Sequence, residues 1–346
     1  MNEPDTNPTR SICILPELKG IGGPASFQSR LIAGLQERGH HVHHNPLDVE
    51  CDVILVNGGT RQVVDVLLAK QRGTRVVQRL AQNNWVYKAR WTGLKHYLRS
   101  EINNRLLAFI RRGLASRVIY QSNFVDDIWN KSYGFTPAQK HIVYNGVDLN
   151  TFKPTDTDSR PPDHIRLLVV EGHLGTGHEK ELENAIYLAE AINARTDQDV
   201  ELVIAGDVPE KIKMYWQENS EQWISWEGIV SQEQIADLDR SAHLLFSSEL
   251  NAGCPNAVLE ALACGCPVIG FETGSLPELI DDSAGATTPY YADHWKLETP
   301  EFEPLAEAAI KIINEQDHYR AGARKLAEDR FNIENAIQEY LNILLD

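Results

Sequence analysis

The chain has 346 residues, of which 42% are hydrophobic and 24% are charged. This composition is ordinary for a globular protein and excludes long disordered tracts, and the length predicts two domains rather than one. No run of about 18 apolar residues occurs, which excludes a membrane-spanning helix. The polar opening, residues 1–10, has no apolar core and predicts no signal peptide.

The net charge of −16 is unevenly distributed. Residues 1–150 hold 19 Lys and Arg against 12 Asp and Glu, whereas residues 151–346 hold 14 against 37. Segment 70–117 contains 12 of the basic residues and a single acidic one, Glu101. Such a segment attracts anions, so we expect either a solvated helix face or a contact with an anionic membrane or an anionic substrate. Nucleic acid is not expected, because the whole chain is acidic and carries no reader motif.

The five cysteines do not form a ligand cluster. Their number is odd, and a lone Cys-x-Cys pair at residues 264–266 is too little for a zinc site. We expect reduced thiols that pack as small apolar side chains in a cytoplasmic protein. The alternative location is the membrane surface, through peripheral contact of segment 70–117.

The chain opens with a predicted strand, glycine loop, helix and strand. Residues 11–15 are apolar, residues 20–24 are glycine-rich, and residues 25–38 carry apolar side chains at helical spacing. The further buried strands expected in this half are residues 52–57, 75–78 and 117–121. A strand, loop, helix and strand in this order build a parallel sheet covered by helices.

A basic amphipathic helix is predicted over residues 94–112. Apolar side chains recur at every fourth position, and basic side chains fall elsewhere on the helical wheel. We expect this helix to pack its apolar side on the domain rather than to anchor in a membrane. The apolar positions are Leu94, Leu98, Ile102, Leu106 and Ile110.

A boundary is expected near residue 150, where the chain becomes rich in turn residues and proline. Strands and helices alternate again beyond it, so the fold class is α/β with two doubly wound, Rossmann-like domains facing across a cleft. We assign residues 1–152 to the first domain and 153–328 to the second. Residues 329–346 form a C-terminal helix that crosses back to the first domain.

The segment 247–270 has the richest functional signal. A strand runs into a loop of Gly, Pro and Asn and then into a helix, which directs the N–H groups of residues 253–257 toward an anion such as a diphosphate. Glu260 follows one turn into that helix, where a carboxylate can accept hydrogen bonds from the vicinal hydroxyls of a sugar. The alternative is that Glu260 only complements the helix dipole.

Several short motifs match one family in the right order. They are Gly22-Gly-Pro24, Asn145-Gly-Val-Asp-Leu149, Glu227-Gly-Ile-Val230, Pro255-Asn256 with Glu260-Ala261, and Gly274 to Glu278. Together they resemble the retaining GT-B glycosyltransferases of the family 4 type, the glycosyl transferases group 1. The resemblance covers nearly the whole chain.

The resemblance implies a site and an activity. Gly22 and Gly23 would lie near the acceptor and the donor phosphates, and Glu260 would bind the donor ribose. The backbone that would hold the sugar and the diphosphate belongs to Gly253, Cys254, Pro255 and Asn256. The nucleotide sugar is then a substrate, and no cofactor or bound metal is expected.

The sequence departs from the family pattern at three places. Ala252 stands where the family usually has a second glutamate, eight residues before Glu260. His173 stands near the position of an expected arginine, so Lys180 is the cation left for the diphosphate. Third, many members carry a histidine after a strand of the first domain, where this chain has residues 78–83 and no histidine. We hypothesise that Arg79 in this stretch supplies the missing positive charge and acts with His173 and Glu260 in catalysis.

The expected function is therefore transfer of a hexose from a nucleotide sugar to an acceptor hydroxyl with retention of configuration. The acceptor would be a carbohydrate or a lipid-linked group, in the assembly of a polysaccharide, glycolipid or glycoconjugate. Two alternatives stay open: a GT-B epimerase, and a catalytically degenerate partner that binds nucleotide sugars without turning them over.

Overall fold

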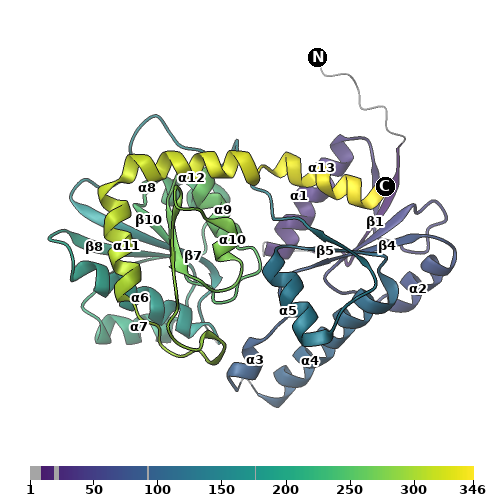
Figure 1. Cartoon of the computed structure of the whole chain (residues 1–346), viewed down its shortest axis with the longest axis horizontal. Coiled ribbons are helices and arrows are strands. Elements are labelled where there is room, and N and C mark those ends of the chain that lie inside the picture. Colours follow the sequence, from purple (N-terminus) through teal and green to yellow (C-terminus); the bar gives the residue numbers. More distant parts are fainter. Residues whose placement is uncertain (1–8, 19–22, 92, 176) are drawn as a thin grey trace. The chain divides into compact units, whose positions relative to one another are not determined.

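The computed structural model describes residues 9–18, 23–91, 93–175 and 177–346 (Figure 1). The chain divides into two compact units. The first unit comprises Met1–Asn84, Gly93–Gly146 and Ile333–Asp346, and the second comprises Trp85–Thr92 and Val147–Asn332. The division between Gly146 and Val147 lies six residues before the boundary that the sequence predicts.

The first unit is built on a six-stranded parallel sheet with the order β2-β1-β3-β4-β5-β6. The change of direction between β1 and β3 is the doubly wound topology expected from the alternation of strands and helices. Its strands are β1 (Ser11–Leu15), β2 (His41–His43), β3 (Val53–Asn57), β4 (Arg75–Leu80), β5 (Arg117–Tyr120) and β6 (Gln139–Ile142). Its helices are α1 (Gly23–Glu37), α2 (Val63–Gln71), α4 (Leu94–Phe109), the π-helical turn η1 (Ile110–Leu114), α5 (Asn123–Tyr133) and α13 (Ile333–Leu345).

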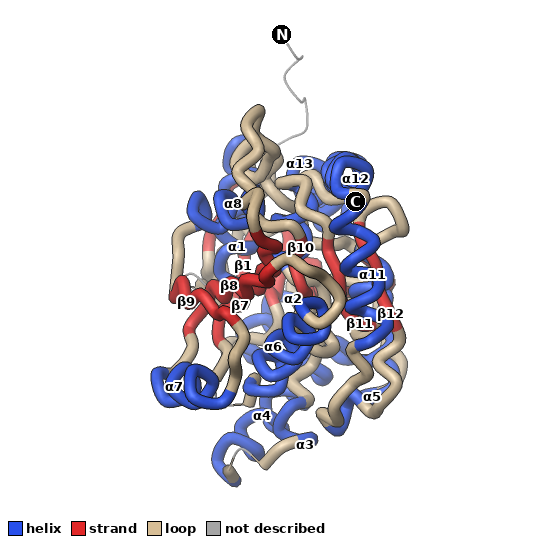
Figure 2. Tube along the Cα trace, turned by 90° about the vertical axis from the view of Figure 1, so that its left-hand side faces the viewer, coloured by secondary structure: helices blue, strands red, loops and turns tan. Residues whose placement is uncertain are grey.

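Alternate residues of these strands pack on opposite faces of the sheet, as the two-residue period of a strand requires. Ile12 and Ile14 of β1 lie in a buried cluster with side chains of α1 and α13. Cys13 and Leu15, the residues next to them, lie in another cluster with α2 and η1. Both faces are therefore covered by helices, which is why the strands read as continuous apolar runs (Figures 1 and 2).

The second unit repeats this plan with the strand order β12-β11-β10-β7-β8-β9, again parallel throughout. Its strands are β7 (His164–His173), β8 (Asp199–Asp207), β9 (Trp223–Gly228), β10 (Leu244–Ser247), β11 (Val268–Phe271) and β12 (Gly285–Thr288). Its helices are α3 (Val86–Ala89), α6 (Glu179–Asn193), α7 (Glu210–Asn219), α8 (Gln232–Ser241), α9 (Asn256–Ala263), α10 (Leu276–Leu279), η2 (His294–Lys296), α11 (Glu303–Asn314) and α12 (Gln316–Arg330). The prediction of two doubly wound α/β domains is confirmed.

One short segment from the first half of the sequence belongs to the second unit. Trp85, just before α3, is buried in the second unit's main core. Its ring meets the ring of Trp295 edge-on at 5.1 Å, and Arg90 forms a 2.6 Å ion pair with Glu179 at the start of α6. No local sequence pattern predicts that residues 85–92 join the second unit, because the residues they contact are about 90 or more positions away in the chain.

The prediction that the 94–112 helix packs a continuous apolar side is wrong for its first half. Leu94, Leu98 and Ile102 are 62%, 51% and 67% exposed, whereas Ile110 is buried in η1. Positions spaced by four drift around an α-helix by about 40° per step, so a long row of them cannot face one way. The π-helical turn η1 shifts the following residues further round the axis, and Ile110 and Leu114 reach the core.

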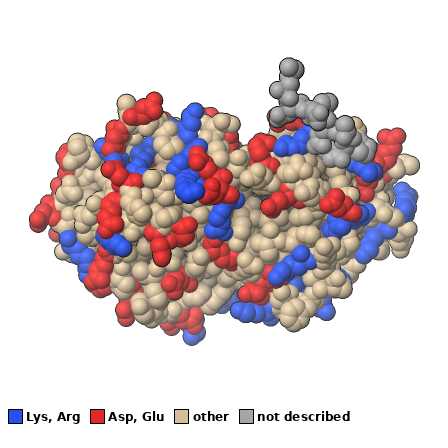
Figure 3. Space-filling model, turned by 45° about the horizontal axis from the view of Figure 1, so that its top comes forward, with Lys and Arg blue, Asp and Glu red and all other residues tan. Residues whose placement is uncertain are grey.

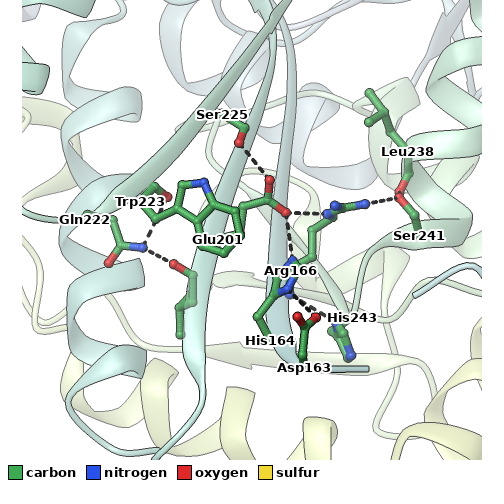
Figure 4. Close-up of polar contacts among 11 residues, drawn as sticks. Asp163, His164, Arg166, Glu201, Gln222, Trp223, Ser225, Leu238, Ser241 and His243 are labelled. Atoms are coloured by element: carbon green, nitrogen blue, oxygen red, sulfur yellow. Dashed lines mark hydrogen bonds and ion pairs between the residues drawn. The ribbon is translucent and has the colours of Figure 1, made fainter. Parts of the chain in front are cut away.

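A polar network ties the amino ends of the second unit's strands (Figure 4). The buried carboxylate of Glu201 on β8 accepts hydrogen bonds from Ser225 Oγ at 2.7 Å and Arg166 Nε at 2.6 Å. Burial alone would raise the pKa of Glu201, but these hydrogen bonds outweigh it and lower that pKa. Arg166 N–H also donates to His243 Nδ1 at 3.0 Å, and burial lowers the pKa of that imidazole to about 4.

This network lies at the opposite end of the sheet from the carboxyl ends of the strands. Open parallel sheets bind ligands at the carboxyl ends, so we assign the network to stability. Across the described ranges, no helix combines the length and apolar content needed to cross a bilayer.

Candidate functional site

The loop between β10 and α9 owes its shape to residues with positive φ. Asn251 has φ 60°, a left-handed conformation that asparagine adopts more readily than most residues. Gly274, after β11, has φ 62°, and a Cβ there would lie 2.6 Å from the backbone nitrogen and oxygen of Ala252. Ser275 N–H donates to the Ala252 carbonyl at 2.9 Å. The loop is thus fastened to the turn that follows β11, and glycine at position 274 permits the contact.

Two polar side chains in this loop region are fully buried without a described hydrogen-bond partner. Neither amide atom of Asn251 has a partner within the described part of the chain, although its side chain is 0% exposed. The same holds for the hydroxyl of Ser275. Unpaired buried polar groups cost free energy, so they are typically kept where a ligand or water completes them.

The predicted donor-binding backbone lies where this loop becomes α9. Gly253 and Cys254 end the loop, Pro255 is the N-cap, and Asn256 is the first helical residue. The proline side chain has no acceptor atom, so it cannot satisfy the N–H groups of the first turn. The positive end of the helix dipole and the first-turn N–H groups together suit an anion.

Glu260 lies one turn into α9 and is 6% exposed. Asp239 on the neighbouring helix α8 is fully buried. Within the described residues neither carboxyl oxygen of Asp239 has a hydrogen-bond partner. Burial, followed by the negative charge of Glu260, raises the pKa of Asp239 well above its ordinary value. The raised pKa disfavours a second negative charge beside Glu260.

A second carboxylate group lies at the carboxyl ends of β7 and β10. Glu171 ends the straight part of β7 and accepts a hydrogen bond from Ser248 Oγ of the donor loop at 3.2 Å. Burial, then the charges of Glu249 and Glu181, raise the pKa of Glu171 well above its ordinary value. The shift favours the protonated carboxyl, which is the form of Glu171 that can donate a hydrogen bond at this end of the sheet.

An imidazole completes this group. His178 is the N-cap residue of α6, and its Nδ1 lies 3.3 Å from Oε1 of the buried Glu181. That hydrogen bond, and the charges of Glu181, Glu249 and Glu179, raise the pKa of His178 although burial opposes the shift. The carboxyl ends of β7 and β10 therefore combine carboxylates with an imidazole that is more readily protonated than usual.

Lys180, the cation predicted for the diphosphate, and His173, which stands near the expected arginine, both have acidic partners. His173 Nδ1 lies 2.9 Å from Asp207 Oδ2 at the end of β8, and about half of each side chain is exposed. Lys180 Nζ donates to Glu183 Oε2 at 2.7 Å and to Thr299 Oγ1 at 2.8 Å, and its side chain is buried. Their roles at the diphosphate remain predictions.

Arg79 is bound inside the first unit and is 3% exposed. Its guanidinium donates to Tyr340 Oη at 3.0 Å, Asn57 Oδ1 at 3.0 Å and Asn145 Oδ1 at 2.9 Å. Its face also stacks on the ring of Phe27 at 3.6 Å. These contacts join β3, β4, α1 and α13, so Arg79 has a structural role within the first unit, and its catalytic role remains a prediction.

The glycine loop of the first unit is mostly outside the described residues. Gly22 lies outside them, and Gly23 begins α1. Their predicted place near the acceptor and the donor phosphates therefore remains a prediction. Among the described residues, no three His, Cys, Asp or Glu side chains converge closely enough to hold a metal ion.

Sequence reasoning missed Asp239, Glu171 and His178. Glu171 and His178 had a usable signal, because each lies where a predicted strand ends or a predicted helix begins, the positions that bind ligands in this architecture. Asp239 had none. It occupies an ordinary helical position, and its burial follows from the packing of α8 on α9.

The fold places the whole chain among GT-B proteins. The structure of sucrose-phosphate synthase from Thermosynechococcus elongatus superposes with a TM-score of 0.72, at 16% identity, over 96% of this chain and 98% of that one. Anabaena Alr3699/HepE, solved in complex with UDP and glucose, superposes with a TM-score of 0.70 at 17% identity, over 96% and 99% of the two chains.

Residues 168–315 match the family model of the glycosyl transferases group 1. The predicted resemblance is confirmed there, and the match contains the whole loop from β10 to α9.

The curated relatives are similar over part of their length. D-inositol 3-phosphate glycosyltransferase of Streptomyces bingchenggensis is 27% identical over 191 residues, which cover 49% of this chain and 41% of that protein. A GDP-mannose-dependent alpha-(1-6)-phosphatidylinositol dimannoside mannosyltransferase of Mycobacterium tuberculosis is 31% identical over 192 residues, covering 53% and 46%. The matched segments thus span less than half of each relative.

Proposed function

We propose that this protein is a glycosyltransferase that uses a nucleotide sugar as its donor. The observation that carries the proposal is the loop from β10 to α9, which is fastened by Gly274 and leads into a helix start followed by the buried Glu260. The family match of residues 168–315 and the UDP complex of the similar Anabaena protein support it.

In this proposal the second unit binds the donor. The backbone N–H groups of Gly253, Cys254 and Asn256 hold the diphosphate, since the positive end of α9 favours an anion there. Glu260 accepts hydrogen bonds from the two ribose hydroxyls, as an acidic residue does in other doubly wound nucleotide sites. The raised pKa of Asp239 disfavours a second negative charge beside Glu260.

The proposed reaction transfers a hexose with retention. The bond between the anomeric carbon and the diphosphate breaks, the acceptor oxygen bonds to the same face of that carbon, and the acceptor proton passes to the leaving phosphate oxygen. The protein's part is to position the partners and to stabilise the charge that develops on the leaving group. Because His173 and Lys180 have acidic partners, we assign part of that stabilisation to His178 and Glu171, whose raised pKa values favour their protonated, hydrogen-bond-donating forms.

The proposed acceptor is the hydroxyl of a carbohydrate or of a lipid-linked group, in the assembly of a polysaccharide, glycolipid or glycoconjugate. The nucleotide sugar is a substrate, and charge stabilisation by the backbone and by His178 leaves no step that requires a resident metal.

The proposal is tested by incubating the protein with UDP-, GDP- and ADP-sugars and a panel of sugar and lipid-linked acceptors. We expect acceptor-dependent release of one nucleoside diphosphate, with the anomeric configuration of the product retained by NMR. Glu260→Gln should lower kcat/KM by about 10- to 100-fold, because it removes a charge-assisted hydrogen bond. Glu233→Gln, an exposed carboxylate on α8, is the matched control and should leave kcat/KM unchanged.

A second candidate is a binding protein that has lost catalysis. Ala252 in place of a glutamate, together with the paired His173 and Lys180, favours it. Saturable binding of a nucleotide sugar with no turnover under any acceptor would replace the enzyme proposal with this one. Conversion of the donor sugar without an acceptor would instead indicate an epimerase.

A further inference from the structure

Helix α4 buries polar residues and exposes apolar ones, the reverse of a usual surface helix. Its buried residues are Ser100, Asn104 and Ala108. Asn84 Nδ2 donates to Ser100 Oγ at 3.1 Å, and Asn104 Nδ2 donates to the Asn84 carbonyl at 2.8 Å. The helix is therefore attached to the first unit through hydrogen bonds.

Another side of α4 presents a row of exposed apolar side chains. Leu94, Leu98, Ile102 and Phe109 are 62%, 51%, 67% and 55% exposed. On an ideal helix these four positions fall within about 80° of one another. Single exposed apolar residues are normal in folded proteins, but a continuous row of them marks a surface that meets a partner.

Basic side chains accompany this row. Lys95 and Arg99 are exposed on one side of it, and Arg105, whose side chain is 74% exposed, lies within it. The acidic residue of α4, Glu101, forms a 3.3 Å ion pair with Arg105 and is largely buried. The exposed surface of the helix therefore carries a positive charge in a chain whose net charge is −16.

Other cations of segment 70–117 serve the fold. Arg79 and Arg111 are buried, and Arg111 donates to Tyr120 Oη at 2.6 Å and to the Gly134 carbonyl at 2.6 Å. Arg75 and Arg117 donate to carbonyls at the end of α13 at 3.0 and 2.6 Å. These four arginines therefore serve the fold, whereas Lys95, Arg99 and Arg105 of α4 are exposed beside its apolar row.

We propose that the exposed row of α4 (Leu94, Leu98, Ile102 and Phe109, with Lys95, Arg99 and Arg105) docks this protein on an anionic lipid bilayer. A helix lying in the plane of the interface buries its apolar side among the acyl chains. Its lysines and arginines extend to the phosphates of the headgroups. The proposal concerns location and is independent of the proposed transferase activity.

The charge of the row favours an anionic bilayer. Lys95 and Arg99 flank the exposed apolar side chains and Arg105 lies among them, and the anionic headgroups of a bilayer match that charge.

The test is flotation of the full chain with two kinds of vesicle, one of phosphatidylcholine alone and one that also contains roughly 30% phosphatidylglycerol. The reference condition is about 0.1 M salt. We expect flotation with the anionic vesicles, none with the neutral ones, and a marked loss at about 1 M salt. Leu98→Gln/Ile102→Gln should lower the partition coefficient by roughly tenfold or more. Lys95→Gln/Arg99→Gln should lower it by about 30-fold, about fivefold per residue.

Two control variants change equivalent residues of the first unit outside α4: Phe135→Gln, whose side chain is 82% exposed, and Lys131→Gln. Both should float like the original protein, and all variants should keep its thermal unfolding temperature. Absence of flotation with anionic vesicles, or equal losses in the α4 and control variants, would overturn the proposal. Concentration-dependent dimerisation abolished by Leu98→Gln/Ile102→Gln, without vesicle binding, would assign the row to a second copy of the chain instead.

Discussion

Asp239 and Arg79 show how two buried charged residues of similar appearance in the sequence reach different electrostatic states. Arg79 has three described hydrogen bonds and an aromatic ring under its guanidinium, so its charge is compensated. Asp239 has no described partner for either oxygen, so burial, followed by the charge of Glu260, raises its pKa. Burial is equal in the two cases, and the number of partners decides the outcome.

Replacing Asp239 by asparagine should stabilise the protein at neutral pH. A folded-state pKa above the unfolded value means that the folded state binds a proton which the unfolded state releases. Stability is therefore lost as pH rises above about 4. Asparagine is neutral at every pH, and we expect Asp239→Asn to add about 1–3 kcal/mol to the free energy of unfolding at pH 7.

Urea unfolding at pH 7 and at pH 4 measures this. The gain should shrink toward pH 4, and Asp237→Asn, an exposed residue paired with Arg240, is the control that should show no gain. A loss of stability in Asp239→Asn at pH 7 would contradict a raised pKa of Asp239.

Replacing Arg79 by lysine separates a structural role from a catalytic one. Lysine keeps the positive charge but cannot reach Tyr340, Asn57 and Asn145 at once, because it lacks the planar fork of arginine. We expect Arg79→Lys to lower the free energy of unfolding by about 2–4 kcal/mol. Thermal unfolding checks this. An unchanged unfolding temperature with a large fall in kcat would favour the hypothesis that Arg79 acts on the donor.

At the scale of the element, helix α4 shows a limit of periodicity. A repeat of four predicts a helix correctly, and residues 94–109 are helical. The repeat does not decide which side faces the core, because the row drifts round the axis and the π-helical turn shifts it again. The hydrogen bonds from Asn84 to Ser100 and from Asn104 to Asn84 settle the orientation, and no sequence pattern marks that pairing.

The network at the amino ends of β7 and β8 gives a second prediction at this scale. A lowered pKa means that Glu201 stabilises the fold at pH values above its unfolded pKa, near 4.5. That stability is lost as pH falls through the lower folded pKa. We expect Glu201→Gln to cost about 1–3 kcal/mol of unfolding free energy at pH 7, because Ser225 and Arg166 lose an anionic partner.

Chemical denaturation across pH 3 to pH 7 checks this prediction. The difference between Glu201→Gln and the original protein should narrow at the acidic end. Asp199→Asn, an exposed residue at the start of the same strand, is the matched control. A difference that stays constant over the whole range would show that Glu201 contributes by packing alone.

At the scale of the whole molecule, the two halves of the sequence differ in charge, and acidic side chains are spread over the part of the surface that belongs to the second unit, at the left of Figure 3. The chain does not divide into units in simple order. The first unit is completed by the last 14 residues, and the second by residues 85–92. Removal of the last 14 residues should therefore affect the first unit, and removal of residues 85–92 should affect the second unit.

Deleting residues 333–346 should destabilise the first unit. Helix α13 places Ile337, Tyr340, Leu341 and Leu344 in the cluster that covers β1 and β3, and burying each such side chain contributes about 1.5–3 kcal/mol. The sum is comparable with the total stability of a domain. Hydrogen exchange should show lost protection in β1, β3 and β4 and retained protection in β7 and β8. Unchanged protection in β1 and β3 would contradict this account of α13.

The sequence by itself determined the alternation of strands and helices, the parallel sheets, the position of the loop before α9 and the place of Glu260 one turn into it. These are local properties, because periodicity, turn residues and helix caps act over a few positions. The tertiary structure alone decided that Asp239 lies beside Glu260, that Ser248 meets Glu171, that Arg79 meets Tyr340 and that Trp85 joins the second unit. Those pairings depend on how distant elements pack, and packing depends on the shape and volume of side chains that are not neighbours in the chain.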